Sequence, residues 1–350
     1  MKGICRMDKE NEMKIIIDAM GGDNAPQEIV KGALRAREEL GVEILLVGQE
    51  EAIRACLPAG QEAEIVDARE IVTMEDDPST ATRRKKDSSM SVALRLLAEG
   101  AGDAVVSAGS TGALLTGATL TVKRIRGIRR AALAPVLPAG EHGVMLIDCG
   151  ANVECTAEYL LQFAYMGSFY AKNLMGIEKP RIGLLNVGTE DTKGGELQHQ
   201  AFALLKDANR KGRICFVGNI EGTGVFSGEA DVVVTDGFTG NILLKSTEGV
   251  IKYMMHALND VFYKNTVNKL AAVVLKKDLG LMKKSLDVNE VGGTALIGIS
   301  KPVIKAHGSS NEVSFFAAIR QAKQFAESGI IDEITANIES MRLRNTNESA

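Results

Sequence analysis

One pattern recurs along this chain: a short apolar run leads directly into a small, polar segment that contains glycine. It is clearest where Val232–Val234 is followed by Thr235-Asp236-Gly237-Phe238-Thr239-Gly240-Asn241 and then by helically spaced apolar residues over Ile242–Tyr253. A buried parallel strand has this continuous β-branched character. The succession of strand, glycine-rich turn and helix predicts an open α/β sheet, whose ligands lie at the carboxyl ends of the strands.

The same pattern occurs at other places in the chain. The expected strands are Lys14–Ile17, Ala104–Val106, Val144–Ile147 and Arg181–Val187, and the polar segments after them are Asp18–Asp23, Ser107–Gly112, Asp148–Asn152 and Gly188–Gly195. A single loop of this kind is usually an ordinary turn between a strand and a helix. If the strands are parallel, however, all these loops share one rim, and we predict the active site there.

Composition narrows the class of protein. The 350 residues are 45% hydrophobic with 36 glycines and no tryptophan, which suits a large α/β core. The net charge of −4 does not indicate nucleic-acid binding. The five cysteines show no C-x-x-C, so we expect neither a disulfide framework nor a zinc site. The same cysteine usage fits a reducing compartment. The uncharged stretch Ala104–Val122 is interrupted by glycine, serine and threonine, so we expect buried strand, loop and helix instead of a membrane span.

The chain shows no internal repeat and no linker-like shift of composition. We therefore expect a single α/β catalytic domain over residues 13–340, with an N-terminal extension over 1–12 that lacks the apolar core of a signal peptide, and a loose tail over 341–350. Residues Thr294–Ile299 have a helix-like pattern and are expected to be helical.

Residues 251–287 predict a helical hairpin within this domain. Its apolar run Leu270–Leu275 is flanked by Lys269, Lys276 and Lys277. The run suits a buried hairpin or a dimer contact. It equally suits a membrane-surface anchor, in which apolar residues insert while lysines meet anionic lipid.

A basic run also has two interpretations. Arg83, Arg84, Lys85 and Lys86 precede a serine pair that predicts the cap of a helix over Met90–Ala98. Four consecutive cations are often only a solvated turn. Beside a helix start, they also suit a dock for an acidic partner or a phosphate.

Several common catalytic motifs are missing from the sequence. It contains no G-x-x-x-x-G-K-[ST], no H-E-x-x-H and no G-x-S-x-G. Gly222-Thr223-Gly224 with Gly228 nearly matches a dinucleotide fingerprint, which is weak evidence by itself. Cys149 follows a strand and could act as a nucleophile, although a buried structural thiol is the favoured interpretation. His307 is the histidine that we place at the rim.

Seven motifs occur in one order: Asp-Ala-Met-Gly-Gly-Asp, Arg-Arg-Lys-Lys-Asp-Ser-Ser-Met, Ser-Ala-Gly-Ser-Thr-Gly-Ala, Gly-Ala-Asn-Val, Leu-Leu-Asn-Val-Gly-Thr-Glu-Asp, Val-Val-Val-Thr-Asp-Gly-Phe-Thr-Gly-Asn and Lys-Ala-His-Gly-Ser-Ser. Together they resemble the bacterial acyl-carrier-protein:phosphate acyltransferase family of phospholipid synthesis. The resemblance covers about residues 13–339.

The resemblance implies a reaction in which long-chain acyl-ACP and inorganic phosphate give acyl phosphate and ACP, without a cofactor or a metal. It implies a doubly wound, mostly parallel α/β fold like that of phosphotransacetylase and the isocitrate/isopropylmalate dehydrogenases, with a protruding hairpin. It further implies a cytoplasmic homodimer held peripherally at the inner face of the cell membrane, and a membrane glycerol-3-phosphate acyltransferase as the downstream partner.

The resemblance also implies roles for individual residues. Lys193 and Asn241 are the catalytic candidates, because a lysine can hold phosphate and an amide can donate to a developing oxyanion. The candidates for binding phosphate or substrate are Asp18, Gly21, Gly22, Ser110, Thr111, Gly112, Asn152, Thr189, Asp236, Gly237, Thr239, Gly240 and His307. ACP would meet Arg83, Arg84, Lys85 and Lys86, and the membrane would meet Leu270, Val273, Val274 and Leu275.

Two other classes of protein remain open at this point. An NAD-linked oxidoreductase on the related dehydrogenase fold would bind NADH. A non-catalytic scaffold that brings ACP to membranes would bind acyl-ACP and leave its thioester intact.

Overall fold

The computed structural model describes residues 13–140, 142–286 and 292–342. They form two compact units: one contains the described residues up to Val122 together with Lys301–Ala326, and the other contains Lys123–Ser300 and the residues from Glu327 onward. The expectation that residues 13–340 work as one catalytic domain stays a prediction. The proposed N-terminal extension and residues 343–350 of the proposed tail lie outside the described residues.

The first unit contains a parallel sheet. Its strands are β1 (Lys14–Asp18), β2 (Glu43–Gly48), β3 (Glu64–Asp67), β4 (Ala104–Ser107) and β12 (Val303–Lys305), in the order β3-β2-β1-β4-β12. The register aligns Asp18 with Ser107, and Ser107 with Lys305. Three polar residues therefore end neighbouring strands at the carboxyl edge, as expected for a sheet whose strands read as apolar runs closed by a polar residue.

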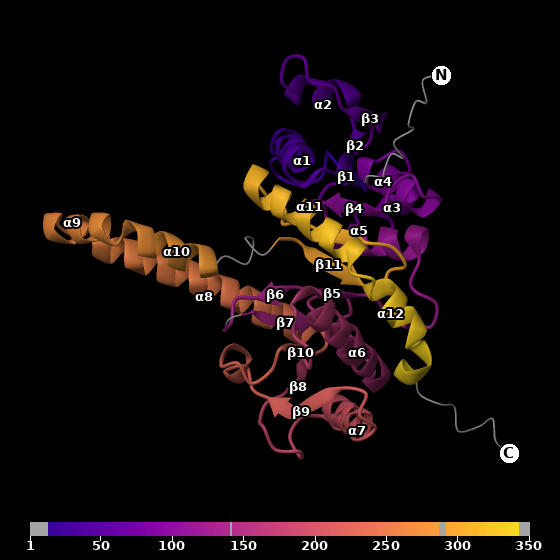
Figure 1. Cartoon of the computed structure of the whole chain (residues 1–350), viewed down its shortest axis with the longest axis vertical. Helices are drawn as coiled ribbons and strands as arrows, with labels where there is room; N and C mark the ends of the chain where they lie inside the picture. The colour runs from indigo at the N-terminus through magenta and orange to yellow at the C-terminus, as the bar shows by residue number, and fades with distance from the viewer. Residues whose placement is uncertain (1–12, 141, 287–291, 343–350) are drawn as a thin grey trace, which may run out of the picture. The chain divides into compact units, whose positions relative to one another are not determined.

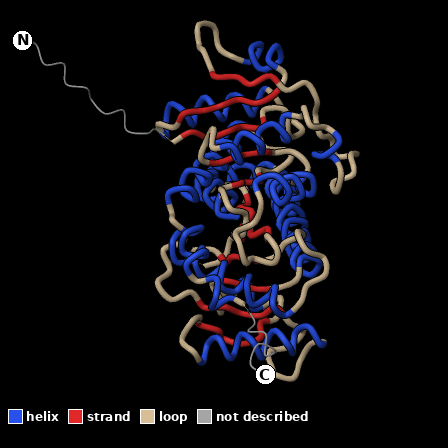
Figure 2. The backbone as a smooth tube through the Cα atoms, turned by 90° about the vertical axis from the view of Figure 1, so that its right-hand side faces the viewer, coloured by secondary structure: helices blue, strands red, loops and turns tan. Residues whose placement is uncertain are grey.

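Helices flank this sheet in the tube view (Figure 2). α1 ends at Gly41, whose φ of 63° gives the left-handed cap that glycine adopts without strain. The expected cap of α4 is present, because the Ser88 side chain accepts a hydrogen bond from the Ser91 N–H. The elements are α1 (Gln27–Leu40), α2 (Glu50–Cys56), α3 (Ala81–Arg84), α4 (Ser89–Glu99), α5 (Thr111–Gly117), the π-helix η1 (Ala118–Val122) and α11 (Glu312–Glu327).

The second unit contains another mostly parallel sheet, in the order β6-β7-β10-β8-β9. Its central strand, β10, is fully buried and pairs in parallel with β7 and β8, while β6 is antiparallel to β7. The strands are β6 (Val136–Leu137), β7 (Val144–Ile147), β8 (Arg181–Leu185), β9 (Cys215–Ile220) and β10 (Val232–Val234).

Two further strands of this unit, β5 (Ala132–Ala134) and β11 (Thr294–Ile297), form an antiparallel pair. The expectation of a helix over Thr294–Ile299 was therefore wrong. Ala295, Leu296 and Ile297 are fully or almost fully buried against β5, so pairing with a distant segment decided the conformation that local spacing could not.

The helices of the second unit alternate with its parallel strands. The mostly buried α6 lies beside α7 and against β10. The elements are α6 (Ala157–Leu174), α7 (Glu196–Arg210), the 3₁₀ helix η2 (Gly224–Phe226), α8 (Gly237–Tyr263), α9 (Thr266–Val274), α10 (Lys276–Leu286), α12 (Ile330–Ala336) and the 3₁₀ helix η3 (Ile338–Met341).

The predicted hairpin is present as α8 with α9 and α10 folded back along it (Figure 1). Many of its apolar side chains are exposed, from Tyr253 and Met254 on α8 to Val273 and Val274 on α9. Residue 287 of the expected hairpin lies outside the described residues. Within the part of the chain that is described, no helix combines the length and the apolarity needed to cross a bilayer. Ala104–Val122 forms β4, α5 and η1, as predicted.

Candidate functional site

Polar loops follow three neighbouring parallel strands of the second unit. The loop after β7 carries Asp148 and Asn152, the loop after β8 carries Lys193, and the segment after β10 opens α8 and carries Asn241. Since β10 lies between β7 and β8 and runs parallel to both, all these loops start at the same edge of the sheet. This edge is a candidate active site. The expectation of a single rim for all five loops was wrong, because the loops over residues 18–23 and 107–112 follow β1 and β4, which belong to the sheet of the first unit.

Asp148 fixes the first of these loops. One of its carboxylate oxygens accepts hydrogen bonds from the Leu133 N–H at 2.9 Å and the Ala151 N–H at 3.2 Å. The other accepts from the backbone N–H of Asn152 at 2.7 Å and from its side-chain amide at 3.0 Å. Burial raises the pKa of Asp148, and these hydrogen bonds act in the opposite direction. These four hydrogen bonds fix the loop over residues 148–152, so Asp148 acts as a structural brace, and we call this segment the braced loop.

The start of α8 fits closely against this braced loop. The Gly237 N–H donates to the Asn152 carbonyl at 2.8 Å, and a Cβ at Gly237 would lie 2.6 Å from that same oxygen. A Cβ at Gly240 would collide with the Asp148 carbonyl oxygen. Glycine is thus required at both positions by the approach of two backbones. Asp236 caps α8 through the Thr239 N–H and hydroxyl, each at 2.8 Å.

The Asn241 side chain lies against Gly150 of the same loop. A Cβ at Gly150, whose φ is 104°, would lie 3.5 Å from the Asn241 side-chain oxygen. Asn241 is itself exposed, on the first turns of α8. Its side chain therefore lies beside the braced loop and is accessible to a substrate.

The loop of Lys193 is anchored through its backbone. The Asn186 amide donates to the Lys193 carbonyl at 3.0 Å, and the buried Asn219 amide donates to the Glu190 carbonyl at 2.8 Å. The Lys193 side chain is about half exposed, and its nearest carboxylate partner is Glu190 at 3.9 Å. Thr189 is also exposed. Among the described residues, no hydrogen bond or ion pair joins Lys193 to Asn241.

A second cluster lies at the carboxyl edge of the first unit's sheet. The Ser107 hydroxyl donates to one Asp18 carboxylate oxygen at 2.6 Å and accepts from the Gly109 N–H at 3.1 Å. The other Asp18 oxygen is buried without a hydrogen-bond partner among the described residues. Burial raises the pKa of Asp18, which favours its protonated form. A Cβ at Gly21 would lie 2.6 Å from the Asp18 carboxylate, so glycine is needed here to leave room for that side chain.

The other expected residues of the first unit surround this cluster. Gly22, with a φ of 106°, approaches the Gly308 carbonyl, which accepts a hydrogen bond from the Asp23 N–H at 2.8 Å. The exposed His307 ring lies in hydrogen-bond contact with the Ser309 hydroxyl at 2.8 Å, through Nδ1. Ser110 precedes the first turn of α5, which holds Thr111 and Gly112.

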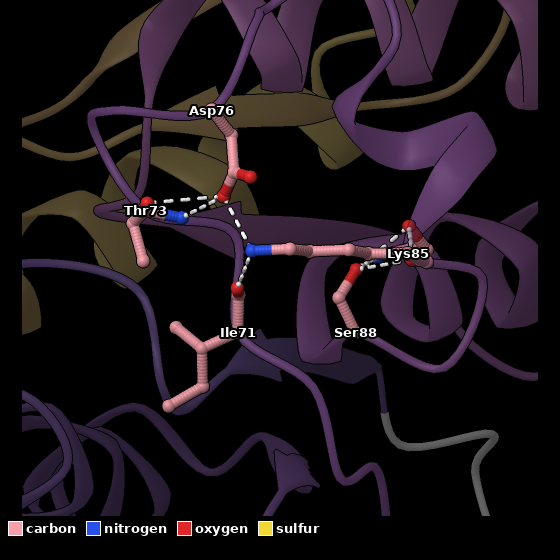
Figure 3. Close-up of polar contacts among 6 residues, drawn as sticks. Ile71, Thr73, Asp76, Lys85 and Ser88 are labelled. Carbon is pink, nitrogen blue, oxygen red and sulfur yellow. Dashed lines mark hydrogen bonds and ion pairs between the residues drawn. The ribbon is translucent and has the colours of Figure 1, made fainter.

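The basic run divides into two kinds of residue. The Lys85 amine donates to the Asp76 carboxylate at 2.6 Å and to the Ile71 carbonyl at 2.9 Å, while Thr73 also donates to Asp76 (Figure 3). The Lys85 partner lowers the pKa of Asp76 to about 2. Arg83, Arg84 and Lys86 are exposed. Lys85 thus ties a loop together, and the other three cations point to solvent.

The described residues do not favour a cysteine nucleophile, a dinucleotide site or a metal site. Cys149 is buried, and burial raises the pKa of its thiol well above the ordinary value, which suits a structural thiol better than a nucleophile. Gly222-Thr223-Gly224 leads only into the short η2, whereas a dinucleotide fingerprint opens a long helix. The residues that the structure describes contain no group of His, Cys, Asp and Glu suited to a metal ion.

Sequence reasoning left several of these polar groups out of the site. Asp148, Ser107 and Lys305 each follow or end an apolar strand, the same signal that selected Asp18 and Asp236. Lys305 is buried, and its amine donates to the carbonyl oxygens of Ala108 and Ala306. Asn186, directly after β8, and Asn219, on β9, hold the Lys193 loop, a relation that depends on strand pairing and has no local signal.

Comparison with known proteins assigns the chain to a family. Residues 13–333 match the model of the family described as "Fatty acid synthesis protein". The chain belongs to this family. Its relatives include two proteins named phosphate acyltransferase. One, from Desulfitobacterium hafniense (strain DSM 10664 / DCB-2), is 48% identical over 326 residues, covering 92% of this chain and 96% of that protein. The other, from Lysinibacillus sphaericus (strain C3-41), is 46% identical over 333 residues, covering 95% and 100%. This member of the fatty acid synthesis protein family is an acyltransferase, so the resemblance and the enzyme class are confirmed.

Solved structures confirm the predicted fold class. A phosphotransacetylase from Streptococcus pyogenes aligns with a TM-score of 0.62 at 19% identity, over 91% of this chain and 94% of that one. A putative 4-hydroxythreonine-4-phosphate dehydrogenase from Salmonella typhimurium aligns with a TM-score of 0.52 at 15% identity, over 89% and 99%. At these identities the likeness concerns the fold of this family member and leaves its chemistry to its own residues.

Proposed function

We propose that the protein transfers the acyl group of long-chain acyl-ACP to inorganic phosphate, giving acyl phosphate and ACP. The observation that carries the proposal is the meeting of the Asp148, Lys193 and Asn241 loops at one sheet edge, in a chain whose relatives are named phosphate acyltransferase. The product would feed glycerol-3-phosphate acylation by a membrane acyltransferase.

The proposed step is a direct displacement at the thioester. A phosphate oxygen forms the new bond to the thioester carbonyl carbon, the carbon–sulfur bond then breaks, and ACP leaves as a thiolate that takes a proton from solvent. Phosphate is itself the nucleophile, so no acyl-enzyme is needed. This fits the buried state of Cys149, whose raised pKa keeps it a thiol.

Lys193 and Asn241 have complementary roles in this proposal. The half-exposed Lys193 amine binds and orients phosphate, whose charge it offsets, and its loop is held by Asn186 and Asn219. The Asn241 amide, which lies beside Gly150, donates to the oxygen that becomes negative as phosphate attacks. Asn152, Thr189, Asp236, Gly237, Thr239 and Gly240 shape the edge around them, and Asp236 does so as a helix cap.

The cluster of the first unit is proposed as a second binding position for phosphate or substrate. Backbone N–H groups of Ser110, Thr111 and Gly112 are the anion donors, supported by Asp18, Gly21, Gly22 and His307, while the Gly109 N–H is held by Ser107. The Asp18 carboxylate, raised in pKa by burial, offers an O–H donor when protonated. This assignment is independent of the roles of Lys193 and Asn241.

ACP is proposed to dock on the exposed cations of the basic run, Arg83, Arg84 and Lys86. Exposed charges of this kind accelerate the encounter with an acidic partner and contribute less to the final affinity. Lys85 fixes the run through its hydrogen bonds to Asp76 and Ile71.

The hairpin is proposed to serve a homodimer contact along α8 and a peripheral attachment to the inner face of the cell membrane at α9. Leu270, Val273 and Val274 are 64%, 70% and 80% exposed, and Leu275 is 41% exposed. Exposed apolar residues beside lysines are what a monotopic anchor inserts into anionic lipid.

We predict that Val273→Asp weakens binding to anionic liposomes about tenfold or more, because an exposed valine that would insert into lipid is replaced by a charge. Turnover of acyl-ACP in solution stays unchanged. Cosedimentation with phosphatidylglycerol vesicles measures the effect, and Val217→Asp, at a 45% exposed valine outside the hairpin, is the control. Equal sedimentation of Val273→Asp and the unmodified protein would remove α9 from membrane attachment.

The assay of the proposed reaction uses purified protein, palmitoyl-ACP and inorganic phosphate, with acyl phosphate trapped as hydroxamate. We expect hydroxamate and free ACP thiol to appear together and only with phosphate. Bound but uncleaved acyl-ACP in excess phosphate would exclude the transferase and favour a scaffold.

A further inference from the structure

The second unit contains a cavity of about 330 Å³ between α6, the end of α7 and η3. Its apolar wall includes Leu161 on α6 and Leu204 on α7, and its polar wall includes Tyr165, Arg213 and Arg342. This volume lies at the small end of the range for ligand cavities. The cavity is therefore suited to a small molecule with both an apolar and a polar part.

The Tyr165 hydroxyl is an uncompensated polar group on the wall of this cavity. The residue is 2% exposed, and its hydroxyl has no hydrogen-bond partner among the described residues. Leaving such a group unpaired is unfavourable, so a ligand acceptor that reached it would gain its hydrogen bond. Burial raises the pKa of Tyr165, with Arg213 acting in the opposite direction, so at neutral pH the hydroxyl carries the proton to donate.

The charges on the wall leave one cation without a carboxylate partner. Asp207 is engaged by Lys211 and by Arg210, and Glu339 lies 3.6 Å from Arg342. Arg213 donates to the Ser340 carbonyl at 3.3 Å and lies beside the Tyr165 hydroxyl, and the ion pairs of the described residues include none to Arg213. The charged residues that line the cavity are Asp207, Lys211, Arg213, Glu339 and Arg342, and their charges sum to one positive charge, which a monoanion balances and a dianion exceeds.

We propose that this cavity binds a small organic carboxylate, with its carboxylate on Arg213 and the Tyr165 hydroxyl and its apolar body against Leu161 and Leu204. An arginine pairs with a carboxylate through parallel N–H donors, which favours this geometry. The site differs in position and chemistry from the Lys193 and Asn241 edge.

The cavity is connected to that edge by the helices that form it. α6 follows the loop braced by Asp148, and α7 begins at Glu196, directly after the Lys193 loop. A ligand that contacts both helices stabilises their packing one or more turns away from the two loops. The natural ligand is therefore expected to be a regulator of the enzyme and not its substrate.

The proposal is tested with the full-length protein and 4-fluorobenzoate, observed by ¹⁹F NMR titration, with 4-fluorobenzyl alcohol as the neutral analogue. Benzoate is too short to report on a long acyl chain and carries one negative charge. We expect saturable binding of the acid, weakened about tenfold by Arg213→Gln and severalfold by Tyr165→Phe. Lys172→Gln, at an exposed cation of α6 that pairs with Glu333, should leave binding unchanged.

Each other result would overturn the proposal. Absence of saturable binding, or binding that survives both Arg213→Gln and Tyr165→Phe, would show that the cavity is not the site. Equal binding of the neutral alcohol would remove the role of charge. Displacement of the acid by inorganic phosphate, with the same dependence on Arg213, would identify an inorganic-anion site instead. Circular dichroism of each variant separates loss of the site from loss of the fold.

Discussion

The loops of Asp148 and Lys193 start at the same sheet edge of the second unit and differ in how their charged groups are used. The buried Asp148 carboxylate receives four hydrogen bonds from its own surroundings. The Lys193 loop is fixed through backbone carbonyls, and the lysine amine itself stays about half exposed. Asp148 therefore uses its charge to stabilise the structure, whereas the charge of Lys193 is accessible to a ligand.

The same contrast occurs in the first unit within one short run. The Lys85 amine is bound by Asp76 and Ile71, while Arg83 and Arg84 are exposed beside it. The sequence alone predicted the same role, contact with ACP, for Lys85 and for its neighbours. Bound and exposed charges are therefore expected to differ in function.

The largest expected effect is on Lys193. Lys193→Ala should lower phosphate-dependent turnover about 10³-fold, because phosphate loses the cation that holds and orients it. The melting temperature should stay unchanged, since the loop is anchored through its backbone. Lys172→Ala, at an exposed lysine paired with Glu333, is the matched control. A Lys193→Ala rate close to that of the control would exclude the lysine from the mechanism.

The next effect concerns Asn241. Asn241→Ala should lower kcat about 10²–10³-fold, the usual loss for one oxyanion donor. KM for acyl-ACP should change little, because the hydrogen bond strengthens as the oxyanion forms. Steady-state kinetics measure both constants, with Asn173→Ala on α6 as the control. A pure rise in KM would reassign Asn241 to substrate binding.

Substitution of Asp148 should mainly lower the stability of the fold. Asp148→Ala leaves buried N–H donors unpaired, and we expect a loss of about 3 kcal/mol in the free energy of unfolding. Urea denaturation measures this loss. Asp191→Ala, which breaks an exposed ion pair with Lys206, should cost at most about 1 kcal/mol. Equal stability of the two variants would show that the hydrogen bonds of Asp148 are not a brace.

The smallest effect is expected for the basic run. The triple variant Arg83→Ala/Arg84→Ala/Lys86→Ala should raise KM for acyl-ACP about tenfold at low salt and less at high salt, since exposed charges act on the encounter. Lys85→Ala should instead lower the melting temperature, because Asp76 loses its partner. A KM of the triple variant equal to that of the unmodified protein at low salt would move the ACP dock elsewhere.

The fold could be predicted largely from local signals. Runs such as Val232–Val234 are apolar on both faces and end in polar, glycine-containing turns, which is how buried parallel strands appear in a sequence. The hairpin was also predictable from its helical apolar spacing. The failure at Thr294–Ile297 has a clear cause: its conformation is set by antiparallel pairing with Ala132–Ala134, far away in the chain.

The candidate site was predictable only in outline. Residues at strand ends could be placed at a rim, and Gly237 and Gly240 proved necessary for the contact between two backbones. The difference between Asp148 as a brace and Lys193 as an exposed cation depends on partners such as Leu133 and Asn219, which no local pattern identifies. Neighbouring cations such as Lys85 and Arg84 can be assigned different roles only when their contacts are known.

The most direct test of the proposed reaction follows the oxygen atoms of phosphate. Palmitoyl-ACP is mixed with phosphate labelled at every oxygen with ¹⁸O, quenched rapidly in acid and analysed by mass spectrometry. Direct attack by phosphate predicts acyl phosphate that retains every heavy oxygen, together with protein of unchanged mass, and this product should be nearly absent with Lys193→Ala. Acylated protein, or unlabelled palmitate as the only product, would contradict the proposed mechanism.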